Sequence, residues 1–128
     1  MMPRLLVVDD EPDTIQMLRL ILQRYGFETI GATCGLDGLS LAQQESPDAI
    51  ILDMMLPDIS GDVFCKRLRN NSVVAGVPIL VLSARSGVEY KEKALAAGAN
   101  YYMTKPADFT ELVSQLKRLI SSAQSLQT

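Results

Sequence analysis

The sequence predicts an α/β fold, a doubly wound sheet of five parallel strands with helices on both faces. Short apolar runs recur along the 128 residues, and stretches with apolar residues at helical spacing separate them. The runs are apolar at every position, which is typical of strands buried on both faces of a parallel sheet. Five such strands alternating with five helices indicate a single doubly wound domain.

Three of the expected strands are continuous apolar runs, namely Leu5–Val8, Ala49–Leu52 and Pro78–Leu82. Glu28–Ala32 is a weaker candidate for the second strand, and Asn100–Met103 is the candidate for the fifth. Each expected strand is followed by a helical stretch, which can return the chain to the start of the next parallel strand.

The segments between these runs carry apolar residues at the spacing of a helix. Gly26 ends the first helix, and Asp108 with Glu111 resembles a capping box at the start of the last one. The fourth helix, at about residues 88–97, has the thinnest apolar stripe. The apolar positions of the five helices are Ile15, Leu18, Leu22 and Tyr25; Leu36, Leu39 and Ala42; Phe64 and Leu68; Val88 and Leu95 with several alanines; and Leu112, Leu116, Leu119 and Ile120.

Length and composition also indicate one domain. A chain of 128 residues, 48% of them hydrophobic, can bury a core on both faces of one sheet. The apolar pattern fades from Ser121, so residues 1–124 are expected to form the domain and residues 125–128 a tail or the start of a linker. No apolar run approaches the roughly 20 residues of a membrane helix, and the run after Arg4 is too short for a signal peptide. We therefore expect a soluble, cytoplasmic protein.

Charge and cysteine content exclude several kinds of site. A net charge of −3 without a cluster of Lys or Arg argues against nucleic-acid binding. The chain has no histidine, and its two cysteines, Cys34 and Cys65, form no CxxC motif. A zinc site and a Cys–His catalytic pair are therefore excluded. Both thiols are expected to be reduced and packed against neighbouring side chains.

Charged and hydroxyl side chains follow the expected strands, where core packing requires neither. In doubly wound sheets, ligands bind beyond the carboxyl ends of the strands. Strands one, three, four and five are neighbours in this architecture, so the residues that follow them should converge on one edge of the sheet. These residues are Asp9, Asp10 and Glu11 after the first strand, Asp53 after the third, Ser83 after the fourth, and Lys105 with Pro106 after the fifth.

Three carboxylates gathered at that edge would repel one another. At about 5 Å and an effective dielectric constant near 20, each pair costs about 3 kcal/mol. A cation is therefore expected among them, and carboxylates without histidine or thiolate select a hard ion, of which Mg²⁺ is the abundant choice. Lys105 supplies a second, fixed positive charge. The alternative is an ordinary acidic loop in which Asp10 or Asp13 caps the first helix.

Together these side chains are suited to phosphoryl transfer. A carboxylate can attack phosphorus and form an acyl phosphate. Asp53 is the best-placed nucleophile, whereas Asp9 and Asp10 are better placed to hold a metal. A lysine can neutralise one phosphoryl oxygen and a hydroxyl can bind another, roles that suit Lys105 and Ser83.

An ordered set of short motifs runs along the chain. Its members are the pair Asp9-Asp10, the stretch Leu52-Asp53-Met54-Met55-Leu56-Pro57 with Gly61, the pair Ser83-Ala84, and the pair Lys105-Pro106. Each motif alone is weak, but the set resembles the receiver domain of bacterial response regulators, from about Arg4 to Gln124. The resemblance implies a flavodoxin-like (βα)5 fold with strand order 2-1-3-4-5.

The resemblance also implies partners and residue roles. The phosphoryl group would come from a sensor histidine kinase or a histidine phosphotransfer protein, and the output would be an attached effector domain or a separate protein. The domain would be a phosphoryl acceptor rather than an enzyme, a monomer or weak homodimer, whose fourth helix, fifth strand and fifth helix form the switching surface. Membranes and nucleic acid would not be its partners. The implied roles are phosphorylation for Asp53; Mg²⁺ coordination for Asp9, Asp10, Asp53 and the backbone carbonyl of Met55; and phosphate contact or switching for Ser83, Lys105 and Tyr102.

Three other functions of the chain can be distinguished from that of a phospho-accepting receiver domain. The site of an aspartate-nucleophile phosphatase would resemble an Asp-x-Asp motif after a strand. Here Met54 and Met55 follow Asp53, so the second acid of that motif is absent. A flavin or nucleotide module would need a glycine-rich turn, whereas Asp9-Asp10-Glu11-Pro12 follows the first strand. A receiver that serves only as an interaction surface would not accept a phosphoryl group from acetyl phosphate.

Overall fold

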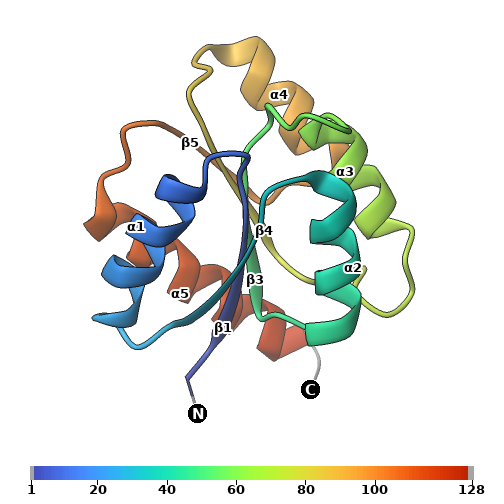
Figure 1. The fold of residues 1–128 in the computed structure, drawn as a ribbon. Helices are drawn as coiled ribbons and strands as arrows, with labels where there is room; N and C mark the ends of the chain where they lie inside the picture. Colours follow the sequence, from blue (N-terminus) through green and yellow to red (C-terminus); the bar gives the residue numbers. More distant parts are fainter. Residues whose placement is uncertain (1, 127–128) are drawn as a thin grey trace.

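The computed structural model describes residues 2–126, which form one sheet with helices on both of its faces (Figure 1). Strands and helices alternate throughout this part of the chain. Their bounds are β1 Arg4–Val8, α1 Pro12–Gln23, β2 Glu28–Ala32, α2 Gly35–Glu45, β3 Ala49–Leu52, α3 Gly61–Arg69, β4 Ile79–Ser83, α4 Val88–Ala97, β5 Tyr101–Thr104 and α5 Phe109–Leu126.

The sheet has the strand order β2-β1-β3-β4-β5, and every neighbouring pair is parallel. In the register, Leu6 of β1 lies between Ile30 of β2 and Ile50 of β3. The predicted doubly wound fold and its strand order are therefore confirmed. The fourth and fifth strands each lie one residue later than expected, so Ser83 is the last residue of β4 rather than the first residue after it.

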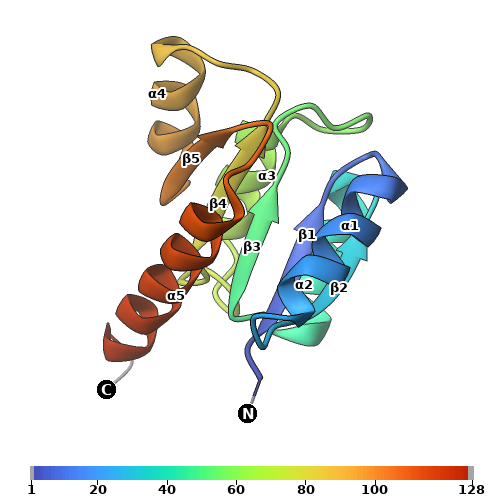
Figure 2. The same ribbon diagram turned by 90° about the vertical axis from the view of Figure 1, so that its left-hand side faces the viewer.

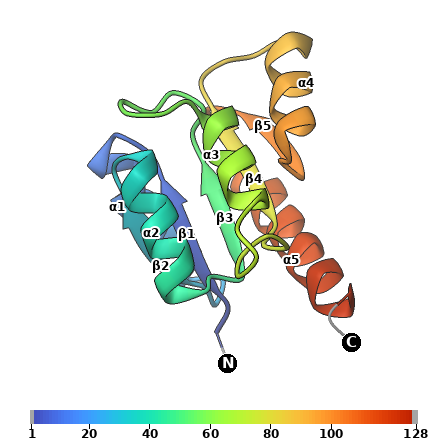
Figure 3. The same cartoon turned by 90° about the vertical axis from the view of Figure 1, so that its right-hand side faces the viewer.

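Two hydrophobic cores lie on opposite faces of the sheet. α1 and α5 cover one face (Figure 2), and α2, α3 and α4 cover the other (Figure 3). Along β1, Leu5 and Val7 belong to the first core, whereas Leu6 and Val8 belong to the second. Alternate side chains of a strand point to opposite faces, so a strand between two cores must be apolar at every position.

Close backbone packing replaces large side chains on α2. Leu36 was expected on the buried stripe of this helix, but it is exposed, and the helix instead buries Gly35, Gly38 and Ala42. A Cβ atom at Gly38 would lie 2.8 Å from a methyl group of Val8 and 3.1 Å from the ring of Phe64. The helix therefore lies close to the sheet because glycine leaves room for its neighbours.

Other expected stripe positions also turn out to be exposed. Tyr25 follows the end of α1 and is exposed, in contrast to Leu22 at its buried face. On α4 the expected positions Val88 and Leu95 are exposed. Only alanines are buried on α4, namely Ala94 and Ala97.

The last helix begins at the predicted Asp108 cap, without the reciprocal Glu111 half of the capping box, and extends further than expected. The N–H groups of Thr110 and Glu111 both donate to Asp108 Oδ1, at 3.0 and 3.2 Å, so Asp108 caps the helix. The Glu111 side chain accepts a hydrogen bond from the Tyr101 hydroxyl at 2.7 Å. α5 continues through Ser121 to Leu126, and the fading apolar pattern coincides with mostly exposed residues from Ser121 to Ser125. The expected tail thus begins inside a helix, and residues 127–128 lie outside the described residues.

None of the helices within residues 2–126 has the length and apolar character needed to cross a membrane.

Phe64 offers a direct test of this packing, because its ring is fully buried on α3 and faces the close approach at Gly38. Phe64→Ala should lower the free energy of unfolding by about 3–5 kcal/mol through lost burial and a cavity. Val73→Ala, at an exposed position, should change it by no more than about 0.5 kcal/mol. Urea denaturation followed by circular dichroism measures both, and equal losses in the two variants would contradict this assignment of the core.

Candidate functional site

Two buried aspartates stand side by side at the carboxyl ends of β1 and β3. The N–H of Asp53 donates to the carbonyl of Val8 at 2.9 Å, and the N–H of Asp9 donates to the carbonyl of Ala32 at 3.1 Å. The sheet ladder thus continues one residue beyond the strands and fixes both backbones. Asp9 is 3% exposed and Asp53 is 7% exposed, so both carboxylates are largely withdrawn from water.

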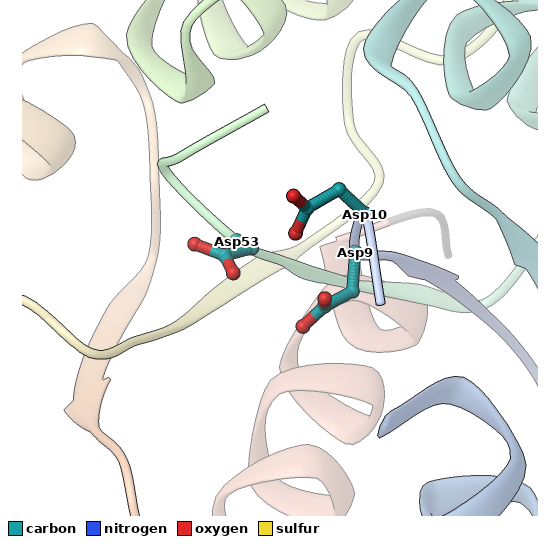
Figure 4. Close-up of side chains that lie close together, drawn as sticks. All are labelled: Asp9, Asp10 and Asp53. Carbon is teal, nitrogen blue, oxygen red and sulfur yellow. The ribbon is translucent and has the colours of Figure 1, made fainter. Parts of the chain in front are cut away.

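Asp10 completes a group of three carboxylates at this edge. Asp9, Asp10 and Asp53 each contribute an oxygen atom, and these atoms all lie within 4.8 Å of one another. Figure 4 shows the three carboxylates facing a common space, two of them from the end of β1 and one from the end of β3. Asp10 itself is exposed. The predicted convergence of these acids is therefore what the structure shows.

Backbone N–H groups orient the two buried carboxylates. Asp9 Oδ1 accepts a hydrogen bond from the N–H of Glu11, and Asp53 Oδ1 accepts one from the N–H of Met55, both at 2.9 Å. The structure does not support the interpretation of Asp10 or Asp13 as the cap of α1. Glu11 occupies that position, without a side-chain capping bond.

Lys105 reaches the same group from the end of β5. Its Nζ atom lies 2.8 Å from Asp9 Oδ2 and 3.2 Å from Asp53 Oδ2. The backbone N–H of Lys105 donates to the carbonyl of Ser83 at 2.7 Å, which fixes the backbone of Lys105 beside the end of β4. Burial alone would lower the pKa of Lys105, but the hydrogen bonds and charges of Asp9 and Asp53 outweigh it and raise the pKa above its usual value. Lys105 therefore stays protonated at neutral pH.

The donor set fits Mg²⁺. Three carboxylates and one ammonium give this small, partly buried space a formal net charge of two negative units. All three side chains offer oxygen, and the absence of histidine from the chain and of cysteine from the group leaves only hard ligands. Asp9, Asp10 and Asp53 are the residues that would hold the ion. The Met55 N–H binds Asp53, and the role of the Met55 carbonyl as a further ligand stays a prediction.

Ser83 and Tyr102 meet at the loop that follows β4. Ser83 is fully buried, and its Oγ atom accepts a hydrogen bond from the N–H of Arg85 at 3.3 Å. Tyr102 is partly buried, and its hydroxyl donates to the carbonyl of Arg85 at 2.6 Å. Burial raises the pKa of Tyr102, the Ser83 hydroxyl opposes this, and the charge of Asp53 raises the pKa further. The two predicted switch residues therefore share one backbone segment, and the Asp53 charge reaches Tyr102.

The loop that follows Asp53 contains one residue that the sequence did not single out. Asp58 lies in the loop between β3 and α3 (residues 53–60), and its carboxylate accepts hydrogen bonds from the N–H groups of Gly35 and Leu36 on α2. An aspartate after Pro57 predicts only a local turn. Its partners lie more than 20 positions earlier in the chain, so no local motif signals the contact.

Comparison with protein families identifies similar chains. The family model described as the response regulator receiver domain matches residues 5–117. The DNA-binding dual master transcriptional regulator RpaA of Synechocystis is 36% identical over 119 residues, which cover 93% of this chain and 49% of RpaA. The chain spans about half the length of the curated relatives it matches.

Solved structures share the fold over most of this chain. The chemotaxis response regulator CheY4 of Vibrio cholerae has a TM-score of 0.86 and 34% identity, covering 93% of this chain and 99% of that one. The receiver domain of the sensor histidine kinase PA1611 from Pseudomonas aeruginosa has a TM-score of 0.86 and 28% identity, covering 94% and 99%. The latter structure holds a magnesium ion coordinated in its active site cleft.

The repulsion within the acid group can be measured through Asp10, which Lys105 does not contact in the structure. In the presence of a chelator, Asp10→Asn should raise the free energy of unfolding by about 1 kcal/mol, because one exposed charge leaves the group. Added Mg²⁺ should stabilise the wild-type protein more than the variant, since the wild type keeps all its ligands. Urea denaturation with and without Mg²⁺ checks both statements.

Asp13→Asn is the matched control, because Asp13 is an exposed acid in the first turn of α1 and lies outside the group. It should not stabilise the metal-free protein, since a negative charge near a helix N-terminus is favourable. Equal behaviour of the two variants would contradict the account of the acid group.

Proposed function

The chain belongs to the response regulator receiver domain family, and we propose that Asp53 accepts a phosphoryl group and thereby switches the surface formed by α4, β5 and α5. One observation carries the proposal. Asp9, Asp10 and Asp53 converge at one edge of the sheet, and Lys105 contacts two of them there. This charge arrangement is suited to a transferring phosphoryl group, which needs positive charge around its oxygens and an oxygen nucleophile in line.

Asp53 is the proposed nucleophile because of its central place. It follows β3, the strand between β1 with its two acids and β4 with Ser83. Its Oδ1 atom is held by the N–H of Met55, and its Oδ2 atom contacts Lys105. In the proposed step a carboxylate oxygen of Asp53 attacks phosphorus, and the bond between phosphorus and the nitrogen of a donor phosphohistidine breaks. The product is an aspartyl phosphate and a free histidine on the donor.

Lys105 and Ser83 would bind the oxygens of the new phosphoryl group. Lys105 already lies within hydrogen-bonding distance of Asp53 and stays protonated. Bound by Asp9, Asp10 and Asp53, Mg²⁺ would neutralise negative charge on the phosphoryl oxygens. That such an ion is held in the active site cleft of the PA1611 receiver domain supports this part of the proposal.

The switch would begin when Ser83 turns toward the aspartyl phosphate. Its Oγ atom now binds the N–H of Arg85, so this turn would release that contact. Tyr102, held by the carbonyl of Arg85, could then turn inward to fill the space. The loop after β4 leads directly into α4, where no residue before Ala94 is buried. A small change at Ser83 would therefore reach a helix that is weakly anchored.

The partners follow from the same scheme. The phosphoryl donor would be a sensor histidine kinase or a histidine phosphotransfer protein in the cytoplasm. The curated relatives include transcriptional regulators about twice as long as this chain, so an attached effector domain or a separate output protein would receive the signal. The domain would act as a monomer or weak homodimer, without binding nucleic acid itself and without acting as an enzyme on a separate substrate.

Phosphoryl acceptance can be tested with acetyl phosphate and Mg²⁺. Intact-mass spectrometry should show the addition of one phosphoryl group to the wild-type protein, and none without Mg²⁺. Asp53→Asn should abolish the addition, because an amide is a poor nucleophile toward phosphorus. Asp48→Asn, at the opposite edge of the sheet, should leave it unchanged. Addition that survives Asp53→Asn would defeat the assignment of the acceptor.

The role of Ser83 can be separated from phosphoryl acceptance. Ser83→Ala should still accept the phosphoryl group at Asp53, but most of the change in amide chemical shifts along α4 and β5 should be lost. Ser72→Ala removes an exposed hydroxyl from the loop after α3 and should leave those shifts as in the wild type. Two-dimensional NMR spectra of ¹⁵N-labelled protein before and after acetyl phosphate give the comparison. A full response in Ser83→Ala would show that the signal takes another route.

A further inference from the structure

The loop between β3 and α3 is irregular, yet it borders the acceptor aspartate. It carries Met55, whose N–H binds Asp53 Oδ1 and whose side chain is exposed. At its end, Gly61 donates its N–H to the carbonyl of Met54 at 3.0 Å. Met54, Leu56 and Ile59 of the loop are partly buried against the second core, whereas Met55 and Asp58 are exposed, so polar contacts add to this packing in fixing the loop.

Asp58 makes three of these polar contacts. Its Oδ1 atom accepts hydrogen bonds from the N–H groups of Gly35 at 2.8 Å and Ile59 at 2.9 Å. Its Oδ2 atom accepts one from the N–H of Leu36 at 2.8 Å. These backbone hydrogen bonds, that of Leu36 first, outweigh the effect of burial and lower the pKa of Asp58 to about 2. The carboxylate is therefore ionised throughout the neutral range.

The first turn of α2 depends on this carboxylate from outside the helix. Cys34 occupies the capping position of α2 and makes no side-chain capping bond. Gly35 and Leu36 are the first two residues of α2, and their N–H groups have no acceptors within the helix. Asp58 thus caps a helix to which it does not belong, and its negative charge lies at the positive end of the helix dipole.

The packing at Gly35 confirms that the loop is pressed against α2. A Cβ atom at Gly35 would overlap the side chain of Ile59 and lie 3.3 Å from Asp58 Oδ1. At the far end of the loop, a Cβ atom at Gly61 would lie 2.7 Å from the Cα atom of Met54. The segment that contains Met55 is therefore held on both sides, by α2 through Asp58 and by α3 through Gly61.

We propose that Asp58 is a positioning residue for Mg²⁺ binding and phosphoryl acceptance, because its capping of α2 fixes the loop that carries Met55 beside Asp53. The inference rests on the proposed function, in which the carbonyl of Met55 completes the ligands of the ion. Without the hydrogen bonds of Asp58 to α2, the loop keeps its connections at Asp53 and Gly61 and the apolar packing of Ile59, but Met55 is held less rigidly beside Asp53. Metal affinity then falls although all three acids are present.

The test compares Mg²⁺ binding by Asp58→Ala and Asp48→Ala in the full chain. Asp48 is the matched control, because its carboxylate also accepts a backbone hydrogen bond, from the N–H of Arg4 at 2.7 Å, but at the opposite edge of the sheet. NMR titration with MgCl₂ should give a dissociation constant about tenfold higher for Asp58→Ala, the lower end of what outer contacts contribute to metal affinity. The dissociation constant of Asp48→Ala for Mg²⁺ should stay within about twofold of the wild-type value, because the hydrogen bond that this variant loses lies far from the metal site.

A second readout separates positioning from a general loss of stability. The rate of phosphorylation by acetyl phosphate should require a higher Mg²⁺ concentration for half-saturation in Asp58→Ala, with the rate at saturation reduced less. Asp58→Asn keeps one acceptor oxygen, so the Mg²⁺ concentration that it needs for half-saturation should lie between those of Asp58→Ala and the wild type. It also provides the measurement should Asp58→Ala fail to fold by circular dichroism.

The outcomes separate the two claims. A wild-type protein that neither binds Mg²⁺ nor gains a phosphoryl group overturns the proposed function, and the role of Asp58 with it. A wild type that does both, with folded Asp58 variants matching Asp48→Ala in Mg²⁺ affinity, overturns the role of Asp58 alone. Weakened Mg²⁺ binding confined to the Asp58 variants supports it.

Discussion

Electrostatic repulsion among three carboxylates is the constraint on which the site depends. The parallel sheet forces Asp9, Asp10 and Asp53 together, because the strands that precede them are neighbours and end at the same edge. Core packing gains nothing from this arrangement, and each close pair of acids costs on the order of 1–3 kcal/mol. Lys105 offsets part of the repulsion through its two ion pairs. In the proposed function, the remaining negative charge would give this edge its affinity for a cation and its sensitivity to a phosphoryl group on Asp53.

The two ends of α4 are held with different strength by their neighbours, and this difference decides which end the proposed switch would move. Arg69, at the end of α3, donates to the carbonyls of Gly98, Ala75 and Val77 and to the side chain of Asn100. These bonds hold the chain where α4 ends and β5 begins. The start of α4 is held more weakly, because residues 88–93 are exposed and their side-chain contacts among the described residues are a ring contact of Tyr90 with Arg85 and a 4.0 Å ion pair of Lys93 with Asp62. A change that begins at Ser83 would thus move the start of α4 more easily than its end.

Much of the fold and the site could be predicted because the signals are local. Continuous apolar runs such as Leu5–Val8 identify strands between two cores, and Asp53 is recognisable because it directly follows such a run. The buried faces of α2 and α4 were harder to predict. Glycine and alanine on the buried faces let those helices pack closely against the rest of the fold, and larger residues such as Leu36 are exposed to solvent. Contacts between distant segments left no local signal. Examples are the hydrogen bond from the N–H of Gly35 on α2 to Asp58 and the one from Arg69 to the carbonyl of Gly98.

The position of the cation is the most direct test of the central claim, and Mn²⁺ can report it because a paramagnetic ion broadens nearby NMR signals. Substoichiometric Mn²⁺ should first broaden the amide signals of Asp9, Asp10 and Asp53 in ¹⁵N-labelled protein, and excess Mg²⁺ should restore them. A second acidic group, Glu28, Glu45 and Asp48 around Arg4, lies at the opposite edge of the sheet and serves as the internal comparison. Broadening that begins there, or that spreads evenly over both edges, would contradict the account.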